Sequence, residues 1–368
     1  MTTRPTDNET DVASVTFDAE SENPQARREH TSYSARRSIV TLLQLEKYSA
    51  LWVWAGLILL FALWVPGTFL TWSNVQIILS SQAVTAIVAL GLIAPLAVGA
   101  IDLAAASAVG FTGMFGAVLM AHSGWGAVPT IAATLVLGCC IGALMGVLVS
   151  VVRISAIIVT LAASSVLSGM VTWLSASQNV VGLPSQFLSI GSGKALGLAW
   201  PFWVMLILCL CAWVFFDHTA TGRYMHATGL GPEAARVSGV PTTRLVVLAL
   251  TLSAAAASVA GLLGTARIGA GDPSFGPSYL LPAYAAVFLG STQVRPGFFN
   301  AWGTVISVYV LATGVQGLQL AGAPVWIPDV FNGLALLAAV GIAVVRQRIA
   351  AHRALARVRR LVMSRASR

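Results

Sequence analysis

Residues 217–244 read DHTATGRYMHATGLGPEAARVSGVPTTR, a polar segment between two long apolar runs. Within it, Pro232 precedes Glu233-Ala234-Ala235, and Gly239 follows after three intervening residues. Proline suits the first helical turn, alanine favours helix and glycine ends one. The segment therefore predicts a short helix over residues 232–239 between two membrane spans. Such a helix is either a handle for a soluble partner or part of an ordinary cytoplasmic loop anchored by arginines, and the segment alone leaves both open.

The apolar runs on either side continue through most of the chain. Of its 368 residues 57% are hydrophobic and 9% are charged, and the mean hydropathy is +0.82. A soluble domain of this composition would have an apolar surface, so that class is excluded. The runs approach the ~20 residues that cross a bilayer as helix, and backbone groups in hydrocarbon must pair internally. The fold class is therefore an all-α multi-pass membrane protein.

Ten apolar runs predict ten transmembrane helices. They lie at residues 51–70, at 83–121 (two spans with almost no loop), and at 129–152, 156–175, 200–216, 245–266, 279–289, 299–320 and 325–345. An even number puts both termini on one side. With the N-terminus inside, the outer loops hold only Lys194 and Arg267, and the inner loops hold Arg153, Arg223, Arg236, Arg244 and Arg295. The positive-inside rule then predicts that both termini are cytoplasmic.

The net charge of +8 lies mainly at the two ends of the chain. We expect a disordered cytoplasmic tail over residues 1–45, a transmembrane domain over 46–345 and a basic cytoplasmic tail over 346–368. Basic ends beside apolar spans are typical of tails that face anionic lipid, and nucleic acid is not an expected partner. The cysteines lie inside apolar runs without a Cys-x-x-Cys pair, which predicts buried free thiols at Cys139, Cys140, Cys209 and Cys211.

An internal repeat occurs at an offset of 170 residues. GLIAPLAVGAID at residues 91–102 aligns with GLLGTARIGAGD at 261–272, and the same offset brings spans two to five onto spans seven to ten. Five spans per half is an odd number, so the halves would be inverted, as in many transporters. Asp102 and Asp272 hold equivalent places after glycine-interrupted spans, which makes both of them, with Gly99, candidates for a translocation pathway. Alternatively, each aspartate caps the helix that follows it and touches no solute.

Motifs of soluble catalysis and of nucleotide binding are missing from the sequence. There is no G-x-x-x-x-G-K-[ST] and no H-E-x-x-H, so we expect no ATP site, metal site or catalytic residue in this chain. The membrane body holds few acids, all at or near span ends: Asp102, Asp217, Glu233, Asp272 and Asp329. Ion-driven carriers generally need buried carboxylates, which disfavours an ion-coupled secondary transporter but leaves it open as the alternative. A multi-pass membrane enzyme is disfavoured because no set of His or carboxylate residues converges.

Several longer motifs resemble one family, the permeases of ribose-, xylose- and arabinose-type ATP-binding-cassette importers. GRYMHATGLGPEAARVSGV at 222–240 resembles its cytoplasmic segment G-R-x-x-x-A-x-G-x-x-x-x-A-A-x-x-S-G. ARIGAGDPSFGPSYLLPAYAAVFLGST at 266–292 is similar to its A-R-x-x-x-x-x-P-x-x-G-x-x-Y…A-A-x-x-L-G-G-T stretch. IIVTLAASSVLSGM at 157–170 and ATGVQGLQLAGAP at 312–324 resemble its F-I-x-T-L-G and N-N-G-L-N-L-x-G segments.

The chain departs from this family pattern at several positions. G-G-I-D-L-S-V-G becomes GAIDLAAA over residues 99–106, which keeps Asp102 but loses a serine and two glycines. Two positions that are usually acidic in the family are Leu280 and Pro282 in this chain. The family's Gly-Gly-Thr is Gly-Ser-Thr at 290–292, and its paired asparagines are Val315-Gln316. If these positions, Gln316 included, line the pathway, the resemblance does not imply that the solute is a pentose. A sugar-like solute is the first expectation.

The resemblance implies a multi-subunit importer. Two permease copies, or one with a relative, form the pathway in the inner membrane, and an extracytoplasmic binding protein delivers the solute to the 178–199 and 267–278 loops. A separate cytoplasmic ATPase uses ATP, and this chain binds no cofactor itself. The implied ATPase-coupling helix consists of Gly229, Pro232, Glu233, Ala234, Ala235, Arg236, Val237 and Gly239.

Overall fold

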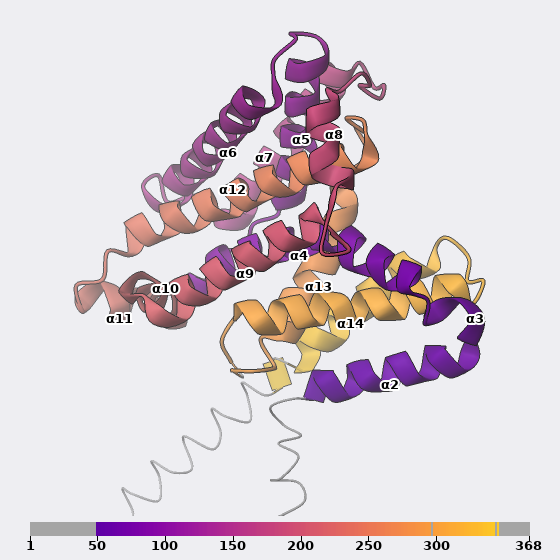
Figure 1. The fold of residues 1–368 in the computed structure, drawn as a ribbon. Helices are drawn as coiled ribbons and strands as arrows, with labels where there is room; N and C mark the ends of the chain where they lie inside the picture. The colour runs from indigo at the N-terminus through magenta and orange to yellow at the C-terminus, as the bar shows by residue number, and fades with distance from the viewer. Residues whose placement is uncertain (1–48, 296, 343, 346–368) are drawn as a thin grey trace, which may run out of the picture. The chain divides into compact units, whose positions relative to one another are not determined.

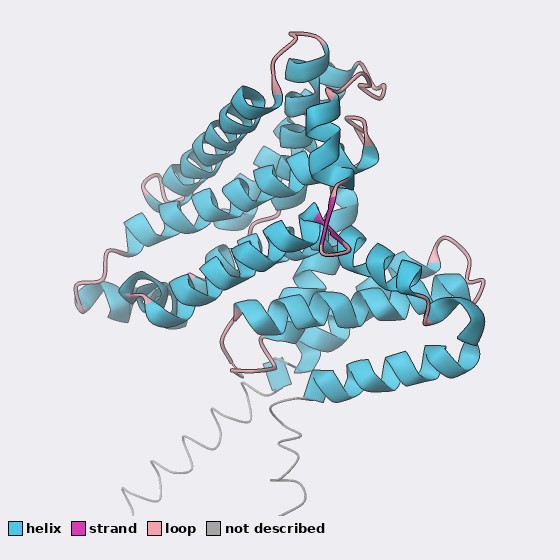
Figure 2. Ribbon diagram, in the orientation of Figure 1, coloured by secondary structure: helices cyan, strands magenta, loops and turns pink. Residues whose placement is uncertain are grey.

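The computed structural model of this chain describes residues 49–295, 297–342 and 344–345. Most of these residues are helical (Figures 1 and 2). The helices are α2 Ser49–Trp64, α3 Pro66–Phe69, α4 Trp72–Ala97, α5 Ala105–Ala121, α6 Ala127–Ser150, α7 Ala156–Ser175, α8 Ser185–Ser192, α9 Trp200–His218, α10 Ala220–Leu230, α11 Pro232–Val237, α12 Thr242–Ile268, the 3-10 helix η1 Pro277–Tyr279, α13 Leu280–Gly290 and α14 Ala301–Leu320. A last apolar helix covers Ile327–Ile342. Strands β1 Lys194–Ala195 and β2 Leu198–Ala199 pair antiparallel as a short ribbon.

Six described helices are long and apolar enough to cross a membrane: α4, α6, α7, α9, α12 and α14. Shorter apolar helices occur at Leu51–Trp64, Ala105–Ala121, Pro277–Gly290 and Ile327–Ile342. Each predicted span overlaps one of these helices. The predicted class, a mostly helical multi-pass membrane protein, is confirmed.

Several predicted boundaries are wrong. The second span begins at Trp72 rather than 83, because α4 continues through the polar run Ser80-Ser81-Gln82 that interrupts its hydropathy. Helices α4 and α5 are separated by residues 98–104 and are not nearly continuous. The 178–199 segment contains α8 and the β ribbon, and the 217–244 segment contains two helices, α10 and α11, instead of one.

Two other predictions concern the cysteines and the tails. Of the four thiols only Cys209 is buried, whereas Cys140 and Cys211 are exposed on the outer faces of α6 and α9. Burial is therefore wrong for those two, since an apolar sequence does not distinguish a core face from a lipid face. The tails predicted at 1–45 and 346–368 lie outside the described residues.

The buried centre is formed by α4, α12 and α14. In the most apolar part of each helix, the share of residues that are buried is 67% in α4, 56% in α12 and 72% in α14. The same share is only 22–28% in α6, α7 and α9. Helix α12 packs against α4, α5 and α6 (Figure 1). Since α6, α7 and α9 leave most of their apolar side chains uncovered, these helices present the surface that lipid or another chain covers.

Glycines allow α6 and α12 to approach closely. Gly138, Gly142 and Gly146 are spaced four residues apart on α6 and face α12. A Cβ atom on Gly142 would lie 2.5 Å from the Leu250 carbonyl oxygen and 2.7 Å from the Thr251 Cα. This spacing is the small-xxx-small pattern with which membrane helices pack in the absence of a hydrophobic driving force.

The helix boundaries follow the 170-residue repeat. Shifted by 170 residues, α4 falls on 242–267, where α12 covers Thr242–Ile268. In the same way α5 falls on 275–291, where η1 and α13 together cover Pro277–Gly290. The 170-residue offset first seen over twelve residues therefore also relates the bounds of α4 to those of α12, and the bounds of α5 to those of η1 and α13.

Candidate functional site

The break between α4 and α5 surrounds Asp102, whose side chain is fully buried. Its Oδ1 accepts a hydrogen bond from the Ala104 N–H at 3.0 Å, next to the start of α5. Its Oδ2 accepts one from the Ser253 hydroxyl of α12 at 2.6 Å. Each carboxylate oxygen therefore has a protein donor, and one of these donors is the N–H of Ala104, the residue just before α5, so that the aspartate supports the start of that helix.

Two further side chains hold the same break. The Tyr284 hydroxyl of α13 accepts from the Asp102 N–H at 3.0 Å and lies 2.9 Å from the Asp102 carbonyl oxygen, to which it donates. The Thr160 hydroxyl of α7 lies 3.2 Å from the Ile101 carbonyl oxygen. Non-helical backbone at membrane depth is tolerated where protein covers it, and these contacts provide that cover. Gly99 begins the break with a positive φ of +81°, which favours glycine.

Asp272 lies in a different environment. Its Oδ1 accepts from the Ser274 N–H at 2.8 Å and from the Ser274 hydroxyl at 2.7 Å, so it organises a local turn. Beside it, Gly271 pairs with Val180 through two backbone hydrogen bonds of 2.9 Å. No hydrogen bond joins Asp102 to Asp272 in the described part of the chain. A pathway role for either residue stays a prediction, and the contacts of Asp102 favour the capping alternative.

Gln316 lies on α14, where its Nε2 donates to the Asn74 Oδ1 at 3.2 Å. Asn74 is buried near the start of α4, and its own Nδ2 donates to the Phe69 carbonyl oxygen at 2.8 Å. In this structure Gln316 therefore ties α14 to the start of α4. The preceding residue, Val315, lies at the cavity described below.

The predicted short helix is present as α11, with Pro232 in its first turn and Glu233 beside it. Its end has the expected glycine geometry, since Gly239 has a φ of +84°. The Gly239 N–H donates to the Arg236 carbonyl and the Val240 N–H to the Ala235 carbonyl, both at 3.0 Å, which is a Schellman ending. The flanking Glu233, Ala234, Arg236 and Val237 are exposed, and Ala235 is buried.

The segment before α11 touches the α4–α5 break. A Cβ atom on Gly229 of α10 would clash with the Ala97 carbonyl oxygen and would lie 3.2 Å from the Gly99 nitrogen. The structure thus brings together two groups of residues that the sequence suggested separately: the predicted coupling segment, residues 229–239, and Gly99 before Asp102. A side chain at position 229 would push these two backbones apart.

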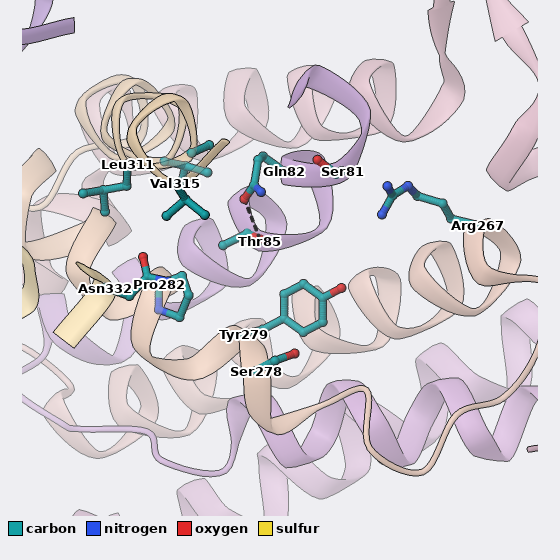
Figure 3. A pocket seen from close by; sticks show the side chains of 12 residues that line it. Ser81, Gln82, Thr85, Arg267, Ser278, Tyr279, Pro282, Leu311, Val315 and Asn332 are labelled. Carbon is teal, nitrogen blue, oxygen red and sulfur yellow. Dashed lines mark hydrogen bonds between the residues drawn. The ribbon is translucent and has the colours of Figure 1, made fainter. Parts of the chain in front are cut away.

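A polar cavity of about 240 Å³ lies between α4, α12, η1, α13, α14 and the last helix (Figure 3). Its lining consists of Ser81, Gln82, Thr85, Arg267, Ser278, Tyr279, Pro282, Val308, Leu311, Ala312, Val315 and Asn332. Within the described chain, neither the Tyr279 hydroxyl nor the Asn332 amide has a hydrogen-bond partner, and Gln82 bonds only to Thr85 at 3.2 Å. The lining contains donors and acceptors for hydroxyl groups, one cation and no carboxylate.

Sequence analysis missed most of this lining. Ser81, Gln82 and Thr85 stand on one face of α4 near its middle, and their spacing of one, three and four residues in an apolar helix is the signal that could have revealed them. The sequence assigns Arg267 to an outer loop, whereas in the structure Arg267 also lines this cavity. Two of the departures from the family pattern, Pro282 and Val315, lie in the lining itself.

Known proteins match the chain over most of these helices. Residues 74–340 match the family described as branched-chain amino acid transport system, permease component. The ribose import permease protein RbsC of Escherichia coli K12 is 33% identical over 276 residues, which cover 74% of this chain and 86% of RbsC. The D-allose transport system permease protein AlsC of the same strain is 26% identical over 300 residues, covering 81% of this chain and 91% of AlsC.

A third relative is the L-arabinose ABC transporter permease protein AraH of Azospirillum brasilense, which is 28% identical over 274 residues, covering 74% of this chain and 80% of AraH. No solved structure matches the chain. The family match covers the break at Asp102, the coupling segment and the polar cavity. The resemblance stated from the motifs is confirmed, and the chain belongs to the family of branched-chain amino acid transport system permease components, as a transmembrane permease subunit of an ATP-binding-cassette importer.

Proposed function

We propose that this permease carries a monosaccharide or sugar-like solute through a pathway that includes the polar cavity. The observation that carries the proposal is the cavity lining, which combines hydroxyl and amide groups from α4, η1 and the last helix, near the middle of α4. Substrate sites of transporters occur near the bilayer midplane where two repeats meet. At about 240 Å³ the cavity lies below the ~300–1,000 Å³ of drug-sized sites and suits a small solute. The names of RbsC, AlsC and AraH, which specify ribose, D-allose and L-arabinose, support the sugar class.

The ion-coupled alternative is not favoured. Both carboxylate oxygens of Asp102 are bonded to protein donors, and the bonded oxygen of Asp272 serves a local turn. The cavity lining itself has no carboxylate among the described residues. An acid free to bind a driving ion is therefore missing at the place where such carriers need one.

The transport topology belongs to the same proposal: ten spans in two inverted five-helix halves, with both termini cytoplasmic. Contacts between loops support the assignment of sides. Asp217 and Arg295, both assigned inside, form an ion pair at 2.8 Å. Val180 and Gly271, both in segments assigned outside, form a backbone bridge. Loops that touch one another lie on the same side of a membrane.

Cysteine labelling checks this topology. Cysteines at the exposed positions Ser192 and Ser274 are expected to react with a membrane-impermeant maleimide added outside intact cells, whereas a cysteine at Ser238 is not. The background should lack the four native thiols. In the outer segment 267–278, Ser274 is a better labelling position than Gly271, because Gly271 is buried and a side chain there would meet Ala117 and Met114. Labelling at Ser238 from outside, with normal labelling after cell lysis as the control, would contradict the cytoplasmic assignment.

Partner surfaces follow from the exposed helices. The cytoplasmic ATPase would dock on α11, and the extracytoplasmic binding protein on the 178–199 and 267–278 segments. A second permease copy, or a relative, would cover α7, which carries the small exposed residues Ser165, Gly169 and Thr172. Small residues on an exposed membrane helix permit close approach of another helix. The chain itself would bind no cofactor, and ATP would be used by the partner.

Reconstitution tests the function. The permease, together with its cognate ATPase and binding protein, is incorporated into proteoliposomes and offered labelled D-ribose, D-allose and L-arabinose. ATP-dependent uptake of at least one sugar, without an ion gradient, is the expected result. A cavity variant, Asn332→Leu, should reduce that uptake at unchanged yield, while Val128→Leu on the exposed face of α6 serves as the control. Uptake that needs an ion gradient and no ATPase would refute the proposal.

A further inference from the structure

A second cluster of contacts lies away from the cavity, between the end of α9 and the loop that joins α13 to α14. The Arg295 Nη1 is 2.8 Å from the Asp217 Oδ1, a charge-assisted hydrogen bond. The Asp217 side chain is only 11% exposed, whereas the Arg295 side chain is 57% exposed. Asp217 stands in the last turn of α9, where the helix dipole disfavours a negative charge. The carboxylate therefore depends on the arginine from the other loop.

An aromatic contact joins α10 to the same loop. The His226 ring of α10 meets the Phe298 ring edge-to-face, with centroids 5.4 Å apart, and lies 6.1 Å from the buried Phe216 ring. Burial lowers the pKa of His226 below its ordinary value, against the opposing effect of Asp217, and the Arg295 charge lowers the pKa further. The lowered pKa favours the neutral form of His226, and the ion pair of this contact is formed by Asp217 and Arg295.

The loop is tied firmly to the two helices that it connects. The buried Asn300 donates to the carbonyl oxygens of Gly290 and Gln293 at 3.1 Å, and its Oδ1 accepts from the Gly303 N–H at 2.7 Å. The Gln293 Nε2 donates to the Ser307 hydroxyl at 3.2 Å. The next residue of α14, Val308, lines the polar cavity. A displacement of this loop would therefore displace α13 and α14 at the cavity.

We propose that Phe216, Asp217, His226, Arg295 and Phe298 form a clasp that transmits movement of α10 and α11 to α13 and α14. Asp217 and Arg295 are its positioning residues, because their ion pair joins the end of α9, which leads into α10, to the loop between α13 and α14. The inference rests on the proposed function, since it assumes that a partner ATPase moves α11. A pair that merely stabilised the end of α9 would affect stability but not the transmission of movement.

The test uses the complex of permease, ATPase and binding protein in proteoliposomes. A cysteine replaces Ser278 in the cavity lining, and the four native cysteines are replaced by alanine. The rate of labelling by an impermeant maleimide is measured without nucleotide and after trapping with ATP and vanadate. The ratio of the two rates reports how strongly the ATPase changes access to the cavity, and it requires no knowledge of the solute.

We expect Asp217→Asn and Arg295→Gln each to reduce the nucleotide effect on this ratio by roughly 2- to 30-fold, the range typical of energetic coupling between sites. The double variant should lose no more than either single variant, because each removes the same pair. Arg295→Lys, which keeps the charge, should retain most of the effect. Arg223→Gln, at an exposed arginine of α10 without an ion pair in the described chain, should match the unsubstituted complex.

An unchanged ratio in both single variants, or losses that multiply in the double variant, would overturn the clasp. Thermal unfolding of each variant separates these results from simple destabilisation, since a structural pair would lower the unfolding temperature and leave the ratio unchanged. A complex that takes up no sugar but still shows nucleotide-dependent labelling would remove the proposed solute and leave the clasp in place. Labelling that is independent of nucleotide in the unsubstituted complex would remove both.

Discussion

Gly142→Leu is expected to prevent α6 from packing against α12 and to abolish the yield of folded permease. The new side chain would begin 2.5 Å from the Leu250 carbonyl oxygen and 2.7 Å from the Thr251 Cα, which are backbone atoms of α12, one of the three central helices. Overpacking of a core typically costs ~1–3 kcal/mol when side chains can give way. Here the backbone itself must move, so we expect a loss above about 3 kcal/mol.

The measurement is the amount of monodisperse protein in detergent and its unfolding temperature. Gly56→Leu is the matched control, because no heavy atom lies within 4 Å of a Cβ at that position of α2. It should give the yield and unfolding temperature of the unsubstituted chain. A Gly142→Leu protein with an unchanged unfolding temperature would show that α6 and α12 do not pack as described.

At position 102, an apolar replacement is expected to destabilise the protein much more than a polar one. Asp102→Leu leaves the Ala104 N–H and the Ser253 hydroxyl without their buried partner. Loss of a cap costs typically ~1 kcal/mol and an unsatisfied buried donor about 1–3 kcal/mol, so we expect a destabilisation of roughly 2–4 kcal/mol. Asp102→Asn keeps an acceptor for the cap and a group that bonds to the Ser253 hydroxyl, so its yield should stay near normal.

Uptake separates the cap from a pathway role. Because Asp102 is fully buried and bonded at both oxygens, Asp102→Asn should transport at a near-normal rate, and so should Asp272→Asn, which keeps its turn with Ser274. The assay is sugar uptake by proteoliposomes, normalised to the amount of reconstituted permease. A tenfold or larger loss of uptake at normal yield, in either variant, would restore that aspartate as a pathway residue. Ser253→Ala provides the matched change on the partner side chain.

The sequence by itself determined the class, the approximate position of each apolar helix and the α11 helix with its glycine ending. These features depend on interactions within a few turns of chain: hydropathy summed over a span, the helix propensity of Glu233-Ala234-Ala235 and the positive φ of Gly239. The 170-residue offset of the repeat was also visible in the sequence, because residues 91–102 align with residues 261–272 without gaps. Local patterns failed where polar residues continue a helix, as at Ser81 and Gln82 of α4.

Only the tertiary structure decided which distant residues meet. Ser253 and Tyr284 reach Asp102 from positions 151 and 182 residues further along the chain, and Arg295 reaches Asp217 across 78 residues. The polar cavity likewise takes its lining from α4, α12, α13 and α14 together. Hydropathy and propensity act along the chain, whereas these contacts depend on which helix faces pack, and in apolar helices that choice rests on glycine spacing and on a few buried hydrogen bonds rather than on any local signal.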